Sequence, residues 1–308
     1  MNWKLPYIAP NKWYHRFYNN YCLKQLLTNR ELFTDANEVS KEQPLFVTGF
    51  FRSGTSLTTR LLNVLGMDLG PENHLLLAKN ERAKLNPDGF FENYLFMETS
   101  LYAFTKLNSW GHLPPASEKV SQLNFDKNDR EQFASYTLCG VHDDRISNKN
   151  KMDVLKNFDL LSLNSYLEKK FVHPYAIKNP HFSVLSPFLI RKWPNAKFLV
   201  CFRKPSTAIA SAAEITPLLD EKIYLRYYSE LVNLPSDKVL FFSHAKLMES
   251  PENSLCALVK ALNLNETKIQ EAASLINPSL HRHKTKTEPK DKAVKDLYEL
   301  MLMRAINK

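Results

Sequence analysis

The sequence contains little glycine and few cysteines. Only seven of its 308 residues are glycine, about a third of the usual share, which excludes collagen-like proteins and glycine-rich linkers. The four cysteines are far apart and form no C-x-x-C pair. We therefore expect neither a disulfide framework nor a zinc site, and no bound metal.

Long apolar runs are also missing. A membrane-spanning helix needs about 20 consecutive apolar residues, whereas the longest runs here, such as residues 197–202, have the length of a strand. The N-terminal residues contain no continuous apolar segment of the kind found in secretory signals. We therefore expect a cytoplasmic protein with reduced cysteines and no membrane span.

The composition is that of a folded, basic protein. Hydrophobic residues make up 44% of the chain and aromatic residues 12%, enough for a sizeable core, which excludes a disordered chain. The 41 Lys and Arg residues exceed the 32 Asp and Glu residues by nine. This excess favours an anionic ligand or surface. It is too diffuse to imply nucleic acid, and we expect no nucleic-acid partner.

Strand and helix patterns alternate along the chain. Apolar runs typical of buried strands occur at residues 44–49, 175–178, 197–202 and 238–242. Helical patterns occur at residues 56–65, 180–193, 205–213, 219–231, 251–262 and near 291–306. The alternation predicts an α/β fold in which helices flank a parallel sheet. We expect residues 1–43 to form an aromatic, partly helical arm and residues 44–308 a single domain, with a helical insertion or cap at 125–170.

Two of the seven glycines, Gly49 and Gly54, lie between the first predicted strand and its helix. The segment reads G-F-F-R-S-G-T-S, which has the spacing of the P-loop, G-x-x-x-x-G-K-[ST]. Glycines let the backbone approach a phosphate, and successive N–H groups with a helix N-terminus attract an anion. The motif therefore predicts an anion-binding loop in a P-loop NTPase-like sheet.

This loop departs from the nucleotide-triphosphate pattern. Thr55 occupies the position of the P-loop lysine, and a cation stands inside the loop at Arg52. In ATP- and GTP-using loops, the lysine reaches the β- and γ-phosphates and a downstream acidic residue helps to hold Mg²⁺. Here the strand at 197–202 is followed by Arg203 and Lys204. The pattern favours a nucleotide without β- and γ-phosphates, with a P-loop nucleotide or small-molecule kinase as the alternative.

Residues 51–56, F-R-S-G-T-S, resemble the 5′-phosphosulfate loop of sulfotransferases, whose pattern is [PY]-[RK]-S-G-T-[TS]. Residues 201–211 resemble the 3′-phosphate motif of that family, in which an Arg ends a strand, a Pro follows two residues later and a Ser lies eight residues beyond the Arg. The matching residues are Arg203, Pro205 and Ser211. The resemblance implies metal-independent, in-line transfer of a sulfuryl group from 3′-phosphoadenosine-5′-phosphosulfate (PAPS) to a hydroxyl or amine.

The resemblance also implies the donor-binding residues. Arg203 and Ser211 would bind the 3′-phosphate, the Arg through a bidentate contact. Arg282, in a basic segment near the C-terminus, is a further candidate for the 3′-phosphate or another part of the donor. The residues expected at the 5′-phosphate and the bridging oxygen are Arg52, Ser53, Gly54, Thr55, Ser56 and Leu57.

The transfer step needs a cation and a general base. Lys178, at the end of a predicted strand, could neutralise the sulfuryl oxygens. Sulfotransferases use His or Glu as the base, and we favour Glu92 because it closes a segment, 86–92, with the glycine and aromatics expected of a substrate-side loop. Glu72, His181 and His74 are the other candidates. Glu72 lies 20 residues after Arg52, close to the catalytic Glu of some members. His181 is separated from Lys178 by two residues, whereas the corresponding Lys and His of family members are separated by one.

The acceptor cannot be identified from these motifs. Family members that act on secreted glycans carry an N-terminal membrane anchor, and the sequence shows none, so we expect a small-molecule, lipid or saccharide acceptor. A non-catalytic anion- or RNA-binding protein is a further alternative. Such a protein would carry clustered Lys and Arg with interleaved aromatics, but the dense basic cluster at 281–292 has no Phe, Trp or Tyr.

Overall fold

The computed structural model describes residues 41–76, 89–126, 129, 150, 163–277 and 288–308. Nearly all of the predicted N-terminal arm therefore lies outside the described residues, as does Arg282. Of the predicted insertion at 125–170, the described part is mainly α8 (Leu163–Lys170). The described residues contain the sheet, the P-loop-like segment and all of the other candidate site residues.

Four parallel strands form the central sheet: β1 (Leu45–Thr48), β2 (Ala176–Lys178), β3 (Lys197–Phe202) and β4 (Val239–Ser243). Their order is β2-β1-β3-β4, and in this register Phe46 of β1 lies between Ile177 and Phe198. The sequence-based prediction of these strands and of a parallel α/β sheet is confirmed. Because the strands are parallel, the segments that follow them all leave from one edge of the sheet.

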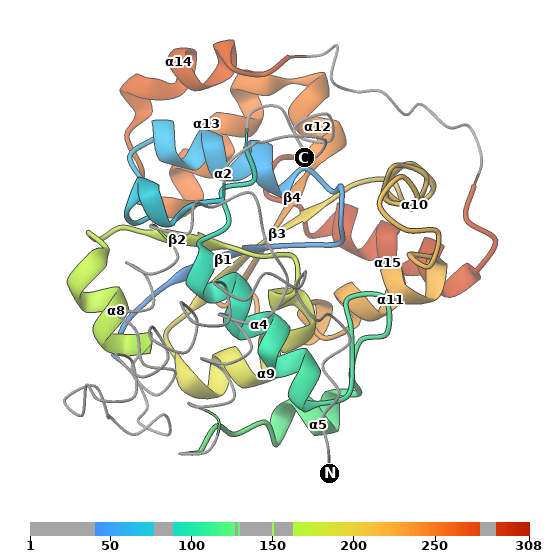
Figure 1. The fold of residues 1–308 in the computed structure, drawn as a ribbon. Coiled ribbons are helices and arrows are strands. Elements are labelled where there is room, and N and C mark those ends of the chain that lie inside the picture. Colours follow the sequence, from blue (N-terminus) through green and yellow to red (C-terminus); the bar gives the residue numbers. More distant parts are fainter. Residues whose placement is uncertain (1–40, 77–88, 127–128, 130–149, 151–162, 278–287) are drawn as a thin grey trace, which may run out of the picture.

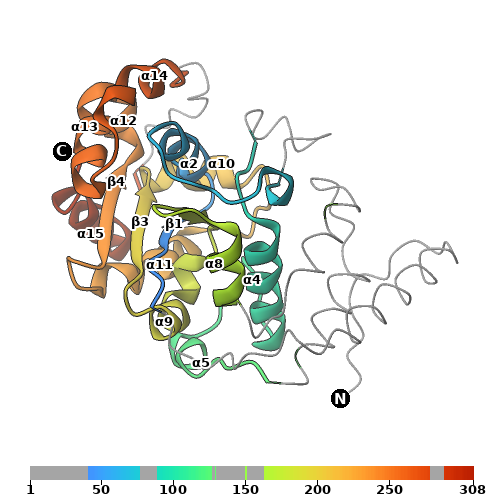
Figure 2. The same cartoon turned by 90° about the vertical axis from the view of Figure 1, so that its left-hand side faces the viewer.

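Helices cover both faces of the sheet (Figures 1 and 2). Side chains alternate along a strand, so Leu45 and Val47 face one helical layer and Phe46 faces the other. The first layer contains α2 (Thr55–Val64), α12 (His244–Glu249), α13 (Pro251–Leu262) and α14 (Ile269–Ser274). The second contains α4 (Tyr94–Lys106), α5 (Ser117–Ser121), α8, α9 (Phe182–Lys192), α10 (Pro205–Ala212), α11 (Glu221–Ser229) and α15 (Lys292–Met303). Short 3₁₀ turns are η2 (Glu72–His74), η3 (Leu231–Asn233) and η4 (Glu266–Lys268).

Aromatic packing holds β1 against the second helical layer and against β3. The ring of Phe46 lies 4.9 Å from that of Phe182, 5.7 Å from that of Trp193 and 5.4 Å from that of Phe198, centroid to centroid. All four side chains are almost fully buried, and each such burial is worth about 1.5–3 kcal/mol. The loop that follows β1 therefore starts from a rigid strand.

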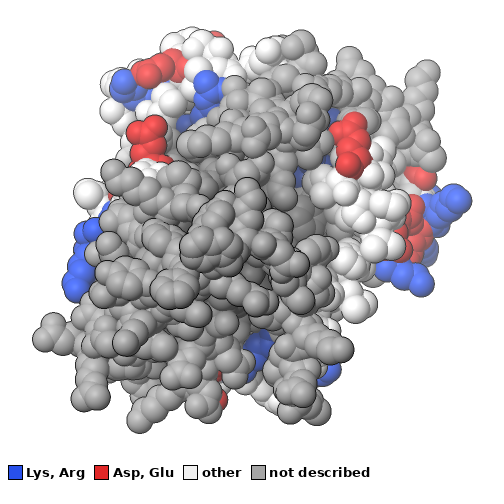
Figure 3. Space-filling view, viewed as in Figure 1, with Lys and Arg blue, Asp and Glu red and all other residues white. Residues whose placement is uncertain are grey.

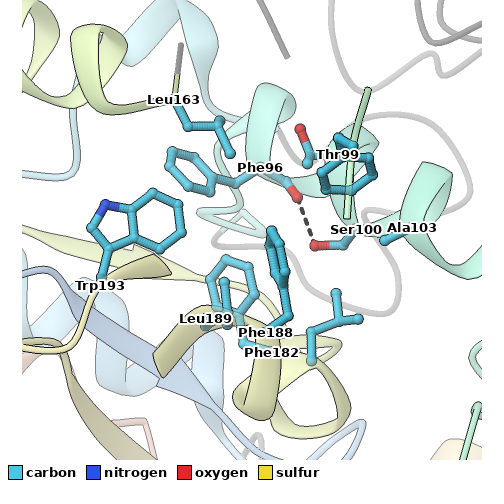
Figure 4. A pocket seen from close by; sticks show the side chains of 11 residues that line it. Phe96, Thr99, Ser100, Ala103, Leu163, Phe182, Phe188, Leu189 and Trp193 are labelled. Atoms are coloured by element: carbon cyan, nitrogen blue, oxygen red, sulfur yellow. Dashed lines mark hydrogen bonds between the residues drawn. The ribbon is translucent and has the colours of Figure 1, made fainter. Parts of the chain in front are cut away.

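A small pocket lies between α4 and α9 (Figure 4). Its wall is mostly apolar, and both of its hydroxyls are already used, because Ser100 Oγ donates to Phe96 O at 2.7 Å and Thr99 Oγ1 donates to Leu95 O at 2.9 Å. None of the candidate site residues lines it. We therefore assign this pocket to core packing. Its lining includes Phe96, Thr99, Ser100, Ala103, Leu163, Phe188 and Trp193.

Candidate functional site

The loop between β1 and α2 requires glycine at both ends. Gly49 has φ 150°, and a Cβ atom there would lie 2.1 Å from the carbonyl oxygen of Cys201 in β3. Gly54 has φ 89°, and a Cβ atom there would lie 2.3 Å from Cδ2 of His244. Real Cβ atoms do not approach other atoms so closely, so both positions exclude side chains. The two glycines let the loop lie directly against the ends of β3 and β4.

Arg52 stands in the middle of this loop in a left-handed conformation. Its φ is 63°, a backbone state that costs a non-glycine residue about 1–3 kcal/mol. The turn is closed by the Ser53 N–H, which donates to Phe50 O at 3.2 Å. The Arg52 side chain reaches α10, where Nε donates to Ser211 Oγ at 3.1 Å. Two motifs 159 residues apart in the sequence therefore meet at one point.

Arg203 follows the carboxyl end of β3, next to this point. It is only 8% exposed. Burial and the nearby charge of Arg52 lower the pKa of Arg203 to about 10, so its guanidinium stays charged at neutral pH. Two like charges held close together destabilise each other unless an anion compensates them. Two neighbouring guanidinium groups have the charge and the N–H donors to bind a phosphate or sulfate group.

The N-terminus of α2 adds backbone donors to the same region. The first N–H groups of a helix have no intrahelical acceptor, and in α2 these belong to Thr55, Ser56 and Leu57. No acidic residue stands in the first turn of α2, so the partial positive charge of the helix end is available to a ligand. The predicted anion-binding residues 52–57 thus lie together on one loop and one helix end.

Lys178 and Glu92 form a buried ion pair beside the loop. Lys178 ends β2, and its Nζ donates to Glu92 Oε1 at 2.6 Å. The same Nζ donates to Ser56 Oγ at 3.2 Å and to Phe90 O at 3.1 Å. The two side chains are 3% and 10% exposed. The structure therefore brings together two catalytic candidates and one predicted donor-binding residue.

A hydrogen-bond network supports the segment that carries Glu92. The Glu92 carbonyl accepts from the Leu76 N–H at 2.9 Å. The next residue, Asn93, caps α4 and donates through Nδ2 to Tyr166 Oη at 2.9 Å. Tyr166 Oη in turn lies 2.7 Å from His74 Nδ1. His74, one of the candidate bases, is 1% exposed and belongs to the network behind Glu92.

The other two candidate bases lie in different surroundings. Glu72 is exposed on η2. His181 is buried at the start of α9, where its ring lies 4.8 Å from that of Phe104 and 5.7 Å from that of Phe51, centroid to centroid. Glu92 is the candidate for which the structure gives an ion pair with Lys178.

Sequence reasoning missed Tyr228, which fastens the loop to the sheet. Its hydroxyl bonds the Phe50 N–H, the Ser53 hydroxyl and the Cys201 carbonyl, each at 3.0 Å. Three of the 13 tyrosines stand at positions 224, 227 and 228. That clustering on one predicted helix is the available signal, and it does not say which hydroxyl faces the loop.

Other features of the described residues bear on the type of site. Among them, no three His, Cys, Asp or Glu side chains lie together as metal ligands would. No helix in the described part of the chain is both long and apolar enough to cross a membrane. On the described part of the face in Figure 3, basic and acidic side chains are interspersed.

Three solved structures of sulfotransferases are similar to the chain. The sulfotransferase domain of the Synechococcus PCC 7002 olefin synthase is 14% identical, with a TM-score of 0.48, and the match covers 89% of this chain and 98% of that one. The sulfotransferase domain of the curacin biosynthetic pathway is 14% identical, with a TM-score of 0.49 and coverages of 85% and 99%. Sulfotransferase STF1 of Mycobacterium tuberculosis H37Rv is 14% identical, with a TM-score of 0.35 and coverages of 94% and 86%.

The family of the chain follows from its match to a family model. No curated protein sequence matches the chain. A model described as "Sulfotransferase family" matches residues 44–268, which is well over half of the 308 residues. The matched range contains the loop at 49–57, the Lys178–Glu92 pair, Arg203 and Ser211. The chain therefore belongs to the sulfotransferase family.

Proposed function

We propose that the protein transfers a sulfuryl group from PAPS to a hydroxyl or amine of a small-molecule, lipid or saccharide acceptor. The observation that carries this proposal is the Arg52–Ser211 contact with Arg203 beside it. It joins the two motifs that resemble the 5′-phosphosulfate loop and the 3′-phosphate site. PAPS has anionic groups at both ends of its sugar, so a donor site needs two such elements held side by side.

The donor's charged groups have distinct partners in this proposal. The 5′-phosphate and the bridging oxygen would receive hydrogen bonds from the N–H groups at the start of α2 and from the Ser53, Thr55 and Ser56 hydroxyls. The 3′-phosphate would bind Arg203 and Ser211. Arg52 lies between the two sets, since its own loop carries the first and its Nε contacts Ser211. From this position, the Arg52 guanidinium would stabilise the negative charge that develops on the leaving 5′-phosphate.

The transfer step would use Lys178 and Glu92. The acceptor oxygen or nitrogen attacks sulfur, the bond from sulfur to the 5′-phosphate oxygen breaks, and Glu92 takes the acceptor's proton. Lys178 contacts both the loop, through Ser56, and Glu92, so it can compensate charge on the sulfuryl oxygens. Most of the rate enhancement would come from positioning and electrostatic stabilisation, with general-base catalysis supplying about 10²–10⁴-fold.

The first test is calorimetric titration with 3′-phosphoadenosine-5′-phosphate, with and without Mg²⁺, beside the same titration with ATP. We expect micromolar binding that does not need Mg²⁺ and that weakens at least tenfold in Arg203→Ala, because that substitution removes a charged hydrogen-bond donor. Binding of ATP alone, dependent on Mg²⁺, would support the kinase alternative. Binding of neither nucleotide would contradict both enzymatic proposals.

A screen for transfer then identifies the acceptor. The protein is incubated with PAPS labelled in the sulfuryl group and with sets of phenols, amines, saccharides and hydroxylated lipids. We expect label to move to one class of acceptor with wild-type protein and not with Glu92→Gln. Transfer at the same rate by Glu92→Gln would exclude this carboxylate as the base.

A further inference from the structure

Tyr228 connects the phosphate-binding loop to the strand that leads to Arg203. The side chain is fully buried on α11. Its single hydroxyl proton goes to Cys201 O at 3.0 Å, and its oxygen accepts from Phe50 N and from Ser53 Oγ, both at 3.0 Å. One oxygen atom thus joins two residues of the loop to β3.

The two loop residues that Tyr228 holds lie on either side of Arg52. Phe50 comes two positions before Arg52 and Ser53 directly follows it. Arg52 is in the left-handed conformation, with φ 63°, which persists only where the surroundings determine it. Since the Tyr228 hydroxyl fixes both ends of the turn, it maintains the backbone state that directs the Arg52 side chain to Ser211.

A second tyrosine of α11 acts on the other half of the site. Tyr224 lies one helical turn before Tyr228, and i, i+4 side chains share a face of a helix. Its hydroxyl donates to the Arg203 carbonyl at 2.9 Å. The rings of Tyr224 and Tyr228 lie 4.8 Å apart, centroid to centroid. One face of α11 therefore holds both the loop with Arg52 and the backbone of Arg203.

The neutral form of the Tyr228 hydroxyl is needed for these contacts, because it both donates and accepts. Burial raises the pKa of Tyr228 well above its ordinary value, so the hydroxyl stays protonated at any physiological pH. A fixed hydroxyl keeps its geometry when an anion binds or leaves.

We propose that Tyr228 is a positioning residue of the donor site. Its hydroxyl holds the 49–54 loop against the end of β3, so that Arg52 and Arg203 face one and the same anionic ligand. The identity of that ligand rests on the proposed function, whereas the role of Tyr228 in holding the loop does not.

The test compares Tyr228→Phe with Tyr227→Phe. Tyr227 lies on the same helix, is equally buried, and donates to Gly111 O at 3.1 Å, so its substitution also removes one buried hydroxyl. Hydrogen exchange of peptides spanning residues 49–56 is measured in the unliganded proteins, and the dissociation constant for 3′-phosphoadenosine-5′-phosphate is measured by titration. We expect Tyr228→Phe to exchange at least tenfold faster in this segment and to bind about tenfold more weakly, with Tyr227→Phe within twofold of wild type in both.

The two readouts separate this proposal from the proposed function. Wild-type protein that fails to bind the nucleotide contradicts the donor, while hydrogen exchange still tests Tyr228. Unchanged exchange and affinity in a folded Tyr228→Phe, or equal losses in both variants, would overturn the role of Tyr228. Should Tyr228→Phe not fold, exchange in wild-type protein decides: the Phe50 amide must exchange as slowly as those of β3, and fast exchange would contradict the proposal.

Discussion

The two halves of the site differ in how their charges are balanced. At the ends of β1 and β3, burial and then the nearby charge of Arg52 lower the pKa of Arg203. At the end of β2, Lys178 has a carboxylate partner at 2.6 Å. In the first half a buried cation is made less favourable by burial and by a like charge, whereas in the second a cation and a carboxylate form an ion pair.

This difference corresponds to two tasks. In the proposed function, the anionic donor binds the first half, where it would contact the two guanidinium groups. In the second half, Lys178 and Glu92 balance each other's charge, and in the proposed function Glu92 would take up the acceptor's proton. The proposed function thus assigns binding of the charged donor to the first half and proton transfer to the second.

The largest expected effect is on turnover in Glu92→Gln. Glutamine preserves the shape of the side chain but accepts no proton, so kcat should fall about 10²–10⁴-fold. The donor-binding half is left intact, so the dissociation constant for 3′-phosphoadenosine-5′-phosphate should stay within threefold of wild type. Steady-state kinetics with the acceptor found by the labelling screen, together with titration, measure both quantities. Parallel losses in turnover and nucleotide affinity would contradict the separation of tasks.

Stability should respond in different ways to loss of a cation in each half. Lys178→Met leaves the Glu92 carboxylate buried without its partner, which should lower the free energy of unfolding by about 3–5 kcal/mol. Arg203→Met removes a cation whose pKa is already lowered by burial and by the charge of Arg52, so we expect a smaller loss than in Lys178→Met. Urea denaturation of the unliganded proteins gives both values. Equal losses would show that the two halves do not differ in charge balance.

Gly49→Ala tests the close approach of the loop to β3. The added Cβ would meet the Cys201 carbonyl at 2.1 Å, and relief of such overlap typically costs about 1–3 kcal/mol. Gly66→Ala is the matched control, because Gly66 also has a positive φ, 102°, but open space around the added atom. We expect Gly49→Ala to destabilise the protein by at least 1 kcal/mol more than Gly66→Ala, a margin within that same range. No difference between them in urea denaturation would mean that the loop can move away from β3.

The smallest expected effect is on chemical labelling of the Cys201 thiol, which lies in β3 in the donor-binding half of the site. Burial raises the pKa of Cys201 to about 12, and the thiolate is the reactive form. Cys256 on α13 is exposed. At pH 8, iodoacetamide should therefore label Cys256 and leave Cys201 unmodified, as read by peptide mass spectrometry. Labelling of Cys201 at a comparable rate would show that the end of β3 opens in solution.

The strands and the P-loop-like segment could be predicted because their signals are local. Each strand is a continuous apolar run, and the loop has two glycines at a defined spacing. The helix α4 was not predicted, because ten of its 13 residues are buried and a helix buried on most sides shows no amphipathic stripe. The sequence marks the charged residues as separate candidates, and it does not show that Lys178 and Glu92 form a pair.

Which residues of the site contact one another depends on the tertiary fold, and local sequence patterns do not encode it. Glu92 and Lys178 are 86 residues apart in the sequence, and no motif links them. Tyr228 bonds Ser53 across 175 residues, and no motif marks a tyrosine that holds a backbone turn. The sheet order β2-β1-β3-β4 places the ends of β1, β2 and β3 side by side, and the contacts of Glu92 with Lys178 and of Tyr228 with Cys201 bring these two side chains to those ends.

A crystal structure of the protein with 3′-phosphoadenosine-5′-phosphate tests the central claim most directly. We expect the 5′-phosphate to accept hydrogen bonds from the N–H groups at the start of α2 and the 3′-phosphate to contact Arg203 and Ser211, with Lys178 and Glu92 left free of direct contact with either phosphate. A nucleotide bound elsewhere, or one whose phosphates contact the Lys178–Glu92 pair in place of Arg203, would contradict the division of the site into a donor half and a transfer half.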